Sequence, residues 1–521
     1  MGSVQISAYN LFFRALIFIF TIGDACRDRY IHMRPALERD SKLTQQINDR
    51  MQALTQSDMT RIHDASMEIL GRVGVAFDHE EALEIFQSSG FKLDGKTVFM
   101  TESDVQQALA SSPPHFNLSA RNPEKSVRVD QDSFVTAPGY GAPYVVTTTG
   151  ERRKGTLQDY ENFCKLIQTS PQIDVNGYLM VEPCDRPSKL AYLDMMVSNI
   201  LLCDKPFMCS TASKQAVEDS LELAAMVFSG RQKIQDNPVV IGLINSRSPL
   251  QYGREMVASL IALARCGQPC IVTSVVMAGL TGPVNLAGAL ALQNAEIMAG
   301  LTLAQLVRAG TPVVYGSASA PIDMKTGALA IGAPELSIIL SAAVRMARFY
   351  NLPNRCGGGL TDAHIPDAQA ALESAFSLLT AVRNGANFIL HACGILSSFM
   401  AMSYTKFMLD EEALAMIRRM MAPLEVSDDT LSLSSIKAVG IGGQFLTQPK
   451  TIERCWDEFF IPGMMKRKNY LKWHDGGSQR IDEIASGAVQ RRLSEYQQPE
   501  LDAAVVSQVS EFVAKRRKEA M

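Results

Sequence analysis

Short apolar runs rich in β-branched residues recur along the chain and alternate with longer amphipathic stretches. The longer stretches, such as AVEDSLELAAMVF, REMVASLIALARC and PELSIILSAAVRMARFY, place apolar residues three and four positions apart, which is the spacing of one helix face. The short runs are typical of buried strands, and they lie at residues 134–137, 173–180, 206–210, 238–244, 269–274, 312–315, 354–358 and 387–391. This alternation predicts an α/β fold, a closed (β/α)8 TIM barrel over residues 131–410.

A doubly wound open sheet is the alternative arrangement of the same units. Neither a GxGxxG loop nor a GxxxxGK[ST] loop occurs in the sequence. Because such phosphate-binding loops are typical of nucleotide-binding open sheets, their absence favours the barrel.

The chain on either side of the predicted barrel has a purely helical pattern. Residues 58–113 show helical spacing, and Thr101 or Ser103 is expected to cap one of the helices. We therefore predict an N-terminal helical subdomain at residues 33–130. Residues 411–521 are helical and charged, which predicts a C-terminal helical extension.

The first residues of the chain do not follow this organisation. An apolar run at residues 11–22 is too short to span a bilayer as a helix, and Arg14 interrupts it. A secretory signal is one interpretation, but no small-x-small cleavage site follows the run. We instead expect translation to begin at Met33, so that residues 1–32 are a non-native start or a disordered leader.

Composition limits the classes of function. Of the residues, 47% are hydrophobic and 20% are charged, and the formal net charge is −4. These values give no reason to expect nucleic acid or a membrane as a partner. The 10 cysteines lack the spacing of a disulfide scaffold or a zinc ribbon, which favours the cytoplasm.

The residues that follow the strands of such a barrel line its active site. Here they are rich in hydroxyl groups, glycines and aromatic rings. Ring faces attract cations, so several tyrosines together favour a cationic substrate, although each one alone is more often a core residue. The candidate substrate-binding residues are Tyr140, Tyr144, Glu182, Asn245, Ser274, Tyr315 and His391.

The segment after the seventh predicted strand holds the remaining candidates. Gly357, Gly358 and Gly359 permit either the close approach of a large ligand or a tight turn before the next helix. Asp362 is a candidate cap for that helix, and His364 lies in a loop at the predicted mouth.

Metal and Schiff-base chemistry have little support. His391 and Cys393 are spaced like a zinc HxC pair, but no third ligand lies at a suitable distance along the chain, so we predict no metal site. Lys205 precedes its predicted strand and Lys325 lies well past one, which argues against a Schiff-base aldolase.

Several stretches of the chain resemble the trimethylamine methyltransferase family, in the branch that lacks pyrrolysine. The stretches are IHDASMEILGRVGVAFDHEEALEIF, VFMTESDVQQALASSPPHFNLSARNP, TTTGERRKGTLQDYENFCKLI, CGGGLTDAHIPDAQAALES and GGQFLTQPKTIERCWDEFFIPG. The first stretch and GGGLTDAHIPDAQA are the most specific. In the last stretch the family often has histidines, whereas this chain has Gln444, Gln448 and Lys450.

The resemblance implies a barrel that passes a methyl group from a methylated amine to Co(I) of a separate, cognate corrinoid protein. It implies no tightly bound cofactor of the chain's own. Relatives without pyrrolysine act on quaternary amines, so we expect glycine betaine as the substrate. Proline betaine, carnitine or another methylated amine is the first alternative. A non-catalytic barrel that binds betaines or the corrinoid protein is the second.

The resemblance also assigns roles to the candidate residues. His364 and Asp362 lie where we place the counterpart of pyrrolysine, and they are the expected catalytic residues. Tyr140 and Tyr144 would flank the ammonium group, and the glycines 357–359 would leave room for the corrinoid. We expect the protein to be a homo-oligomer.

Overall fold

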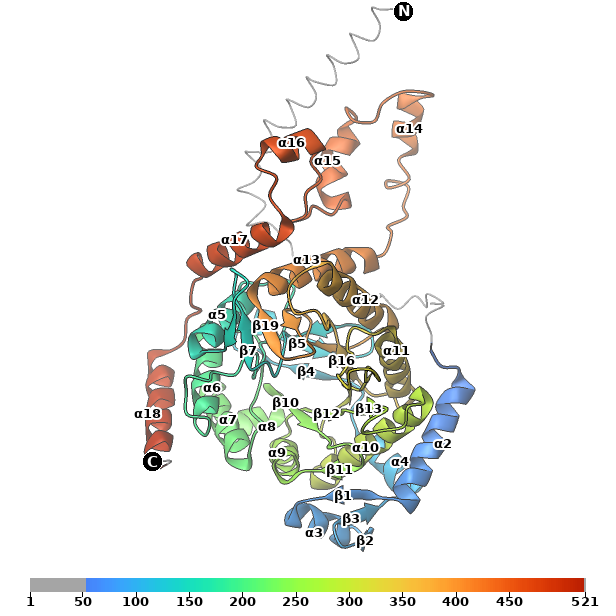
Figure 1. Ribbon diagram of the computed structural model, residues 1–521, viewed down its shortest axis with the longest axis vertical. Helices are drawn as coiled ribbons and strands as arrows, with labels where there is room; N and C mark the ends of the chain where they lie inside the picture. The colour runs from blue at the N-terminus through green and yellow to red at the C-terminus, as the bar shows by residue number, and fades with distance from the viewer. Residues whose placement is uncertain (1–52, 520–521) are drawn as a thin grey trace, which may run out of the picture. The chain divides into compact units, whose positions relative to one another are not determined.

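The computed structural model describes residues 53–519 (Figure 1). The expected leader at residues 1–32 lies outside the described residues. The described chain forms two compact units. Residues 419–462 make up the smaller unit, and residues 53–418 together with 463–519 make up the larger one.

A seven-stranded sheet lies at the centre of the larger unit, and each neighbouring pair of its strands is parallel. These strands lie close to seven of the eight predicted positions, which confirms an α/β fold with a parallel sheet. In spatial order they are β6 (Val135–Thr136), β17 (Phe388–Leu390), β16 (Asn354–Gly357), β14 (Val313–Ser317), β12 (Cys270–Ser274), β10 (Val240–Asn245) and β9 (Phe207–Met208).

The remaining predicted strand, at residues 173–180, is not a regular strand. The Asp174 carboxylate accepts a hydrogen bond from the Thr136 N–H group at 3.0 Å, so a side chain takes the place of a ladder carbonyl oxygen. The segment still reaches both edges of the sheet. Asn176 forms a parallel bridge with Phe207, and the Val175 N–H group donates to the Thr136 carbonyl oxygen at 3.0 Å.

Helices follow the strands and surround the sheet (Figure 1). They are α5 (Leu157–Gln168), α6 (Ala191–Leu202), α7 (Lys214–Val227), α9 (Arg254–Arg265), α10 (Leu286–Val307), α11 (Pro334–Phe349), α12 (Ala368–Asn384) and α13 (Tyr404–Met421). In the described chain, α10 alone is long and apolar enough to cross a membrane. However, 83% of its apolar window is buried inside the protein, as in the core helix of a globular fold.

The N-terminal part of the described chain is not purely helical, in contrast to the prediction. It contains three helices, α2 (Gln56–Arg72), α3 (Glu80–Ser88) and α4 (Glu102–Ser111), and Thr101 caps the last of them. It also contains strands of three residues each, which are too short for their alternation to stand out in the sequence. Strands β1 (Val75–Phe77), β3 (Thr97–Phe99) and β2 (Lys92–Asp94) form a sheet with β11 (Gln251–Tyr252).

The C-terminal part of the chain is helical, and its helices divide between the two units. The smaller unit contains α14 (Leu433–Val439) and α15 (Pro449–Glu458). Helices α16 (Tyr470–Asp475), α17 (Ile481–Ser494) and α18 (Ala503–Glu519) belong to the larger unit.

Candidate active site

A cavity lies at the carboxyl ends of β14, β16 and β17, which is the end of the sheet where the sequence predicted the site. The space that the centre of a water molecule can reach within it has a volume of about 20 Å³, which is enough for about one water. The cavity is therefore nearly closed. It is lined by Ser317, Ala318, Ser319, Ile331, Leu336, Leu340, Arg355, Cys356, Gly357, Leu360, His391 and Phe399.

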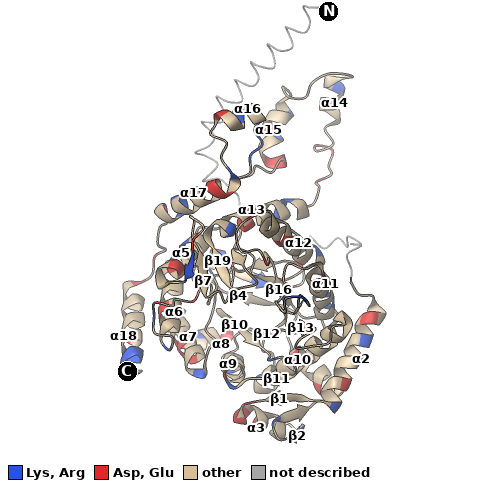
Figure 2. Cartoon of the chain, viewed as in Figure 1, with Lys and Arg blue, Asp and Glu red and all other residues tan. Residues whose placement is uncertain are grey.

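Arg355 is the one charged residue in the seven strands of the sheet, and charged residues otherwise lie mostly on the helices and loops (Figure 2). Its side chain is 2% exposed. One guanidinium nitrogen, Nη1, donates to the Ser317 carbonyl oxygen at 2.7 Å, whereas Nε has no partner. No carboxylate of the described chain forms an ion pair with it, and burial lowers its pKa to about 10. Among the residues that the structure describes, Arg355 is thus a buried cation without a counter-ion.

His391 lies beside Arg355 and is 6% exposed. Burial, and to a lesser degree the positive charge of Arg355, hold the pKa of His391 well below its ordinary value. The imidazole is therefore neutral. Its Nδ1 atom accepts a hydrogen bond from the Tyr140 N–H group at 3.1 Å, which leaves the proton on Nε2. His391 offers the cavity a neutral hydrogen-bond donor.

Phe399 lines the cavity from the turn between two short antiparallel strands, β18 (Ile395–Leu396) and β19 (Ala401–Ser403). Its ring centroid lies 4.7 Å from that of His391. Ser397, Ser398 and Phe399 have φ angles of 52°, 50° and 75°, so three successive non-glycine residues adopt the left-handed conformation. Such strain persists only where the surrounding contacts hold it. The loop is therefore held in place by its neighbours rather than by its own preferences.

Asp362 and His364 supply two of these contacts. The Asp362 carboxylate accepts hydrogen bonds from the Ser398 hydroxyl at 2.6 Å and from the N–H groups of Ile331 and Gly332 at 3.0 and 2.8 Å. Nδ1 of the exposed His364 lies 2.9 Å from the Ser397 hydroxyl oxygen. Both residues thus contact the loop that carries Phe399, and neither lines the cavity.

The interpretation of Asp362 as a helix cap is wrong. Asp367 caps α12 instead, because its side chain accepts a hydrogen bond from the Ala370 N–H group at 3.1 Å. Asp362 is committed to the loop contacts described above, and it lies five residues before the N-cap position that Asp367 occupies, too far away to cap the helix.

Four of the predicted residues lie near the same end of the sheet without lining the cavity. Tyr140 is bonded through its backbone to His391 and through its phenol to Thr211, and burial raises the pKa of that phenol. The ring of Tyr144, at the start of β7 (Tyr144–Val146), is covered by the Arg152 guanidinium at 4.5 Å. That ring face is already occupied by a cation. Glu182 is exposed, and Asn245 is half-buried at the end of β10.

Ser274 and Tyr315 are not brought to the cavity. The Ser274 hydroxyl donates to the buried Glu296 carboxylate at 2.7 Å, and the Tyr315 hydroxyl donates to the Asn294 side-chain oxygen at 3.1 Å. Both acceptors lie on α10. These two hydrogen bonds place both side chains in the layer between the sheet and the helix.

The glycine run is explained by packing within the chain. An added Cβ would lie 2.4 Å from Leu360 at Gly357, 2.6 Å from Ile389 at Gly358 and 2.8 Å from the Ala392 carbonyl oxygen at Gly359. None of the three glycines has a positive φ. Their missing side chains let β16 approach the end of β17, and of the three only Gly357 lines the cavity.

A buried ion pair below the glycine run was not predicted from the sequence. Lys406 Nζ, on α13, donates to the Asp410 carboxylate at 2.6 Å, to the Ser374 hydroxyl at 2.7 Å and to the Gly359 carbonyl oxygen at 3.0 Å. Lys406 is 1% exposed and Asp410 is 3% exposed. The i,i+4 spacing of a lysine and an aspartate with three apolar residues, FML, between them was the available signal.

Comparison with known proteins decides the family. The profile of the family described as trimethylamine methyltransferase (MTTB) matches residues 26–521. The chain belongs to this family. It is 43% identical to a glycine betaine methyltransferase of Desulfitobacterium hafniense, over 91% of this chain and 99% of the relative. It is 32% identical to a proline betaine:corrinoid methyltransferase of Eubacterium limosum, over 85% of this chain and 93% of the relative.

More distant relatives agree with this assignment and with the fold. A trimethylamine methyltransferase of Methanosarcina thermophila is 30% identical over 87% of this chain and 95% of the relative. The crystal structure of the monomethylamine methyltransferase of Methanosarcina barkeri superposes with a TM-score of 0.50 at 10% identity, over 87% of this chain and 90% of that chain. The chain is thus a methyltransferase with an α/β fold related to that structure.

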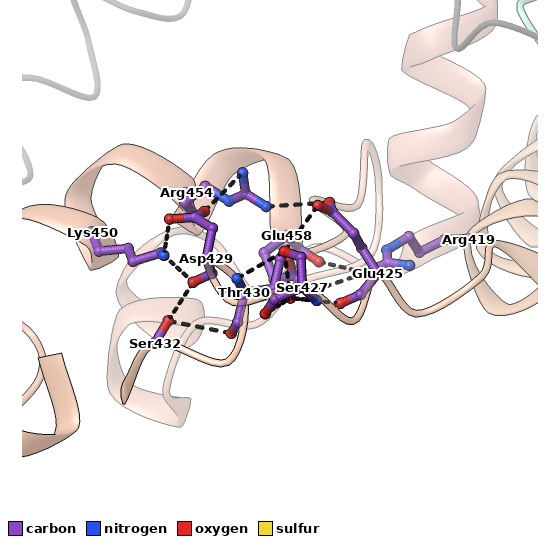
Figure 3. Close-up of polar contacts among 9 residues, drawn as sticks. All are labelled: Arg419, Glu425, Ser427, Asp429, Thr430, Ser432, Lys450, Arg454 and Glu458. Atoms are coloured by element: carbon purple, nitrogen blue, oxygen red, sulfur yellow. Dashed lines mark hydrogen bonds and ion pairs between the residues drawn. The ribbon is translucent and has the colours of Figure 1, made fainter. Parts of the chain in front are cut away.

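In this member of the trimethylamine methyltransferase family, the segment GGQFLTQPKT, where the resemblance led us to expect histidines, lies in the smaller unit. Gln444 is exposed, and Gln448 precedes α15. Lys450 is bonded to the Asp429 carboxylate and to its carbonyl oxygen (Figure 3). These three residues therefore belong to the internal contacts and the surface of the smaller unit.

Proposed function

We propose that this chain transfers a methyl group from glycine betaine to Co(I) of a separate corrinoid protein, in the cavity beside Arg355. The names of its relatives support methyl transfer from betaines to a corrinoid protein. The single observation that carries the substrate class is the buried Arg355 guanidinium without a counter-ion. A betaine is a quaternary ammonium that carries a carboxylate, and this carboxylate supplies the missing charge.

The residues around Arg355 suit the rest of the substrate. Nε of Arg355 and Nε2 of the neutral His391 are two donors for one carboxylate. The ring of Phe399 lies beside His391 and lines the same cavity, and its face would attract a quaternary ammonium. Arg355 and Phe399 were both missed from the sequence, because one lies within a strand and the other is positioned by a strained loop.

The chemistry demands orientation rather than acid or base groups. The corrinoid of the partner protein supplies the nucleophile that accepts the methyl group. A quaternary amine leaves without being protonated, so the neutral His391 is not required as an acid. The task of Arg355, His391 and Phe399 is to bind the betaine and to point one methyl group outward, and such positioning lowers a barrier by up to about 7–11 kcal/mol.

The surface around the cavity suits a large, transient partner. Three apolar side chains in the connections that follow β14, β16 and β17 are exposed. Met324 follows β15 (Ala320–Pro321), Ile365 lies between β16 and α12, and Met400 lies in the turn between β18 and β19, and they are 72%, 54% and 45% exposed. Exposed apolar side chains grouped at one end of a fold mark a surface for binding. The corrinoid protein would approach across these loops, and the glycines 357–359 allow the close packing of β16 and β17 that brings Arg355 and His391 together.

Entry of the substrate requires movement, because the cavity holds about one water. The loop at residues 397–399 is the moving part in this proposal, since its conformation depends on contacts with Asp362 and His364. Asp362 and His364 are then positioning residues, and they act through Phe399. The 43% identity to a glycine betaine methyltransferase, against 32% to the proline betaine relative, favours glycine betaine as the substrate.

Three broader expectations belong to the same proposal. The sheet closes into a (β/α)8 barrel through residues 173–176, supported by their bonds to Thr136 and Phe207. The chain works in the cytoplasm, in agreement with its free cysteines, and without a tightly bound cofactor of its own. It works as a homo-oligomer.

A spectroscopic assay tests the function. The cognate corrinoid protein is held as Co(I) and offered glycine betaine, proline betaine, carnitine and trimethylamine in separate reactions. We expect methylation of the corrinoid with glycine betaine and none with trimethylamine, which lacks a carboxylate. Methylation from trimethylamine alone would contradict the role of Arg355. Betaine binding without any methylation would favour a non-catalytic binding protein.

A further inference from the structure

One row of residues crosses four neighbouring strands of the sheet and ends at Arg355. Its members are Cα partners in the register of the sheet, Asn245 with Thr273, Thr273 with Gly316 and Gly316 with Arg355. Ser274, which follows Thr273, and Tyr315, which precedes Gly316, are hydrogen-bonded to α10. Because successive side chains of a strand point to opposite faces, the row lies on the face turned away from α10.

The chemistry of this face changes at the row. Two positions earlier on the same strands, and on the same face, lie Leu243, Ile271 and Val314, which are at most 6% exposed. The row itself contains an amide, a hydroxyl, a glycine and a guanidinium. Polar side chains therefore replace apolar ones near the carboxyl ends of the strands, where Arg355 also lines the cavity.

Two members of the row have a buried polar atom without a hydrogen-bond partner among the described residues. They are Oγ1 of Thr273, a residue that is 1% exposed, and Nε of Arg355. A buried hydroxyl without a partner costs free energy, and most buried polar atoms in proteins are paired. Both groups can donate a hydrogen bond. One acceptor from outside the chain, placed between them, would satisfy both.

The two donors approach each other over β14. A Cβ atom added to Gly316 would overlap Oγ1 of Thr273, so the Thr273 side chain leans across the space over Gly316. From the opposite side, Nη1 of Arg355 donates to the carbonyl oxygen of Ser317, the next residue of β14, at 2.7 Å. Neighbouring strands lie about 4.8 Å apart. The Thr273 hydroxyl is therefore about one strand spacing from β16, which is within the span of a carboxylate and its hydrogen bonds.

We infer that the Thr273 hydroxyl is a substrate-binding group, which donates a hydrogen bond to the same carboxylate as Arg355. The inference rests on the proposed function, in which that carboxylate belongs to a betaine. It adds a third donor to Arg355 and His391, from the far side of β14. Thr273 then contributes to the choice of a betaine over an amine without a carboxylate. Gly316 contributes as well, because a side chain there would push Thr273 away from Arg355.

Other parts of a substrate suit this position less well than a carboxylate. A quaternary ammonium cannot accept a hydrogen bond, and the positive charge of Arg355 would repel it. A neutral acceptor would leave the buried charge of Arg355 uncompensated. A carboxylate has two acceptor oxygens and a negative charge, so it satisfies both donors and offsets the charge.

Isothermal titration calorimetry of the full chain with glycine betaine, and separately with choline, tests the inference. Thr273→Val keeps the size and shape of the side chain and removes the hydroxyl. We expect its affinity for glycine betaine to fall roughly 10-fold, as for one hydrogen bond to a charged group, and its affinity for choline to stay the same. The free energy of unfolding, measured with urea, should not fall, because the lost hydroxyl has no partner in the described chain.

Two further variants serve as controls. Thr302→Val removes the same group from α10, where Thr302 is also 1% exposed and its hydroxyl donates to the Met298 carbonyl oxygen at 2.8 Å. This change should leave the affinity for glycine betaine as it is in the natural chain. Thr273→Ser keeps the hydroxyl and should keep most of the affinity.

The outcomes separate this inference from the proposed function. Unchanged glycine betaine affinity in Thr273→Val, with weakened affinity in Arg355→Met, would overturn the role of Thr273 and leave the proposed function standing. Equal losses for glycine betaine and choline would overturn that role as well, because they would indicate a change in the shape of the site. A chain that binds glycine betaine through Thr273 but never methylates the corrinoid would support this inference and contradict the proposed function.

Discussion

Two buried cations lie on neighbouring parts of the larger unit and differ in one respect. Lys406 is 1% exposed and Arg355 is 2% exposed. Lys406 donates to three oxygens of its own chain, and one of them belongs to the Asp410 carboxylate. Arg355 donates to one carbonyl oxygen, has an unpartnered Nε and faces no carboxylate of the described chain.

This difference indicates a structural role for Lys406 and a ligand-binding role for Arg355. Taking a charge out of water costs several kcal/mol, and the cost is offset only where an opposite charge and hydrogen bonds replace the water. For Lys406 the chain supplies both, so its role ends within the fold. For Arg355 the chain compensates only part of the cost of burying the charge. The guanidinium can therefore bind an anion from outside the chain, and the folded state is less stable as a result.

Removing Lys406 should have the largest effect on folding. Lys406→Met leaves the Asp410 carboxylate buried without its partner, and we expect the free energy of unfolding to fall by about 3–5 kcal/mol. Lys406→Met/Asp410→Leu removes both charges and should recover most of this loss. Urea unfolding followed by circular dichroism measures both variants. Equal losses in the single and the double variant would show that packing, not the ion pair, explains the effect.

Removing Arg355 should weaken substrate binding strongly and should not lower the free energy of unfolding. Arg355→Met should lower the affinity for glycine betaine roughly 10- to 150-fold, the equivalent of losing about 1.5–3 kcal/mol of charged hydrogen bonding. The free energy of unfolding should stay the same or rise, because an uncompensated buried charge is gone. Isothermal titration calorimetry and urea unfolding measure the two quantities.

Two controls sharpen this prediction. Choline, a quaternary amine without a carboxylate, should bind equally weakly to the natural chain and to Arg355→Met. Arg355→Lys keeps the charge but loses the two-pronged geometry of the guanidinium, so it should recover only part of the affinity. A destabilised Arg355→Met with unchanged betaine affinity would place Arg355 with Lys406 as a structural residue.

The sequence predicted the sheet well because buried parallel strands are recognisable as short apolar runs between amphipathic helices. It failed at residues 173–180, where the Asp174 side chain takes over a hydrogen bond of the ladder. It also failed for strands of three residues such as β1 and β2, which are too short to show an alternation of apolar and polar residues.

The site was predicted less well than the fold, for reasons that are also physical. His391 lines the cavity at the end of the sheet where the sequence predicted the site, because strand order alone decides where strand ends meet. Ser274 and Tyr315 were assigned to the site because a strand that is apolar on both faces does not reveal which face a residue takes. Phe399 depends on three left-handed non-glycine residues, which no local pattern in the sequence indicates.

The smallest expected effect concerns His391, whose burial beside Arg355 keeps it neutral. In the unfolded chain this imidazole takes up a proton near pH 6.5, while in the folded chain it does so only at lower pH. The unfolded state therefore binds more protons below pH 6.5. As the pH is lowered through this range, the free energy of unfolding decreases by up to about 1.4 kcal/mol per pH unit.

His391→Asn should remove this dependence while keeping the local structure. Asparagine tolerates the φ of 60° at this position, and its side-chain oxygen replaces Nδ1 as the acceptor for the Tyr140 N–H group. Urea unfolding at pH 7.5 and at pH 5.5 measures the free energy of unfolding of both chains. Between these two pH values the natural chain should lose roughly 1 kcal/mol more of this free energy than His391→Asn loses. Parallel pH profiles would mean that His391 titrates normally in the fold. His391 would then not be the neutral donor that the proposed betaine site places beside Arg355.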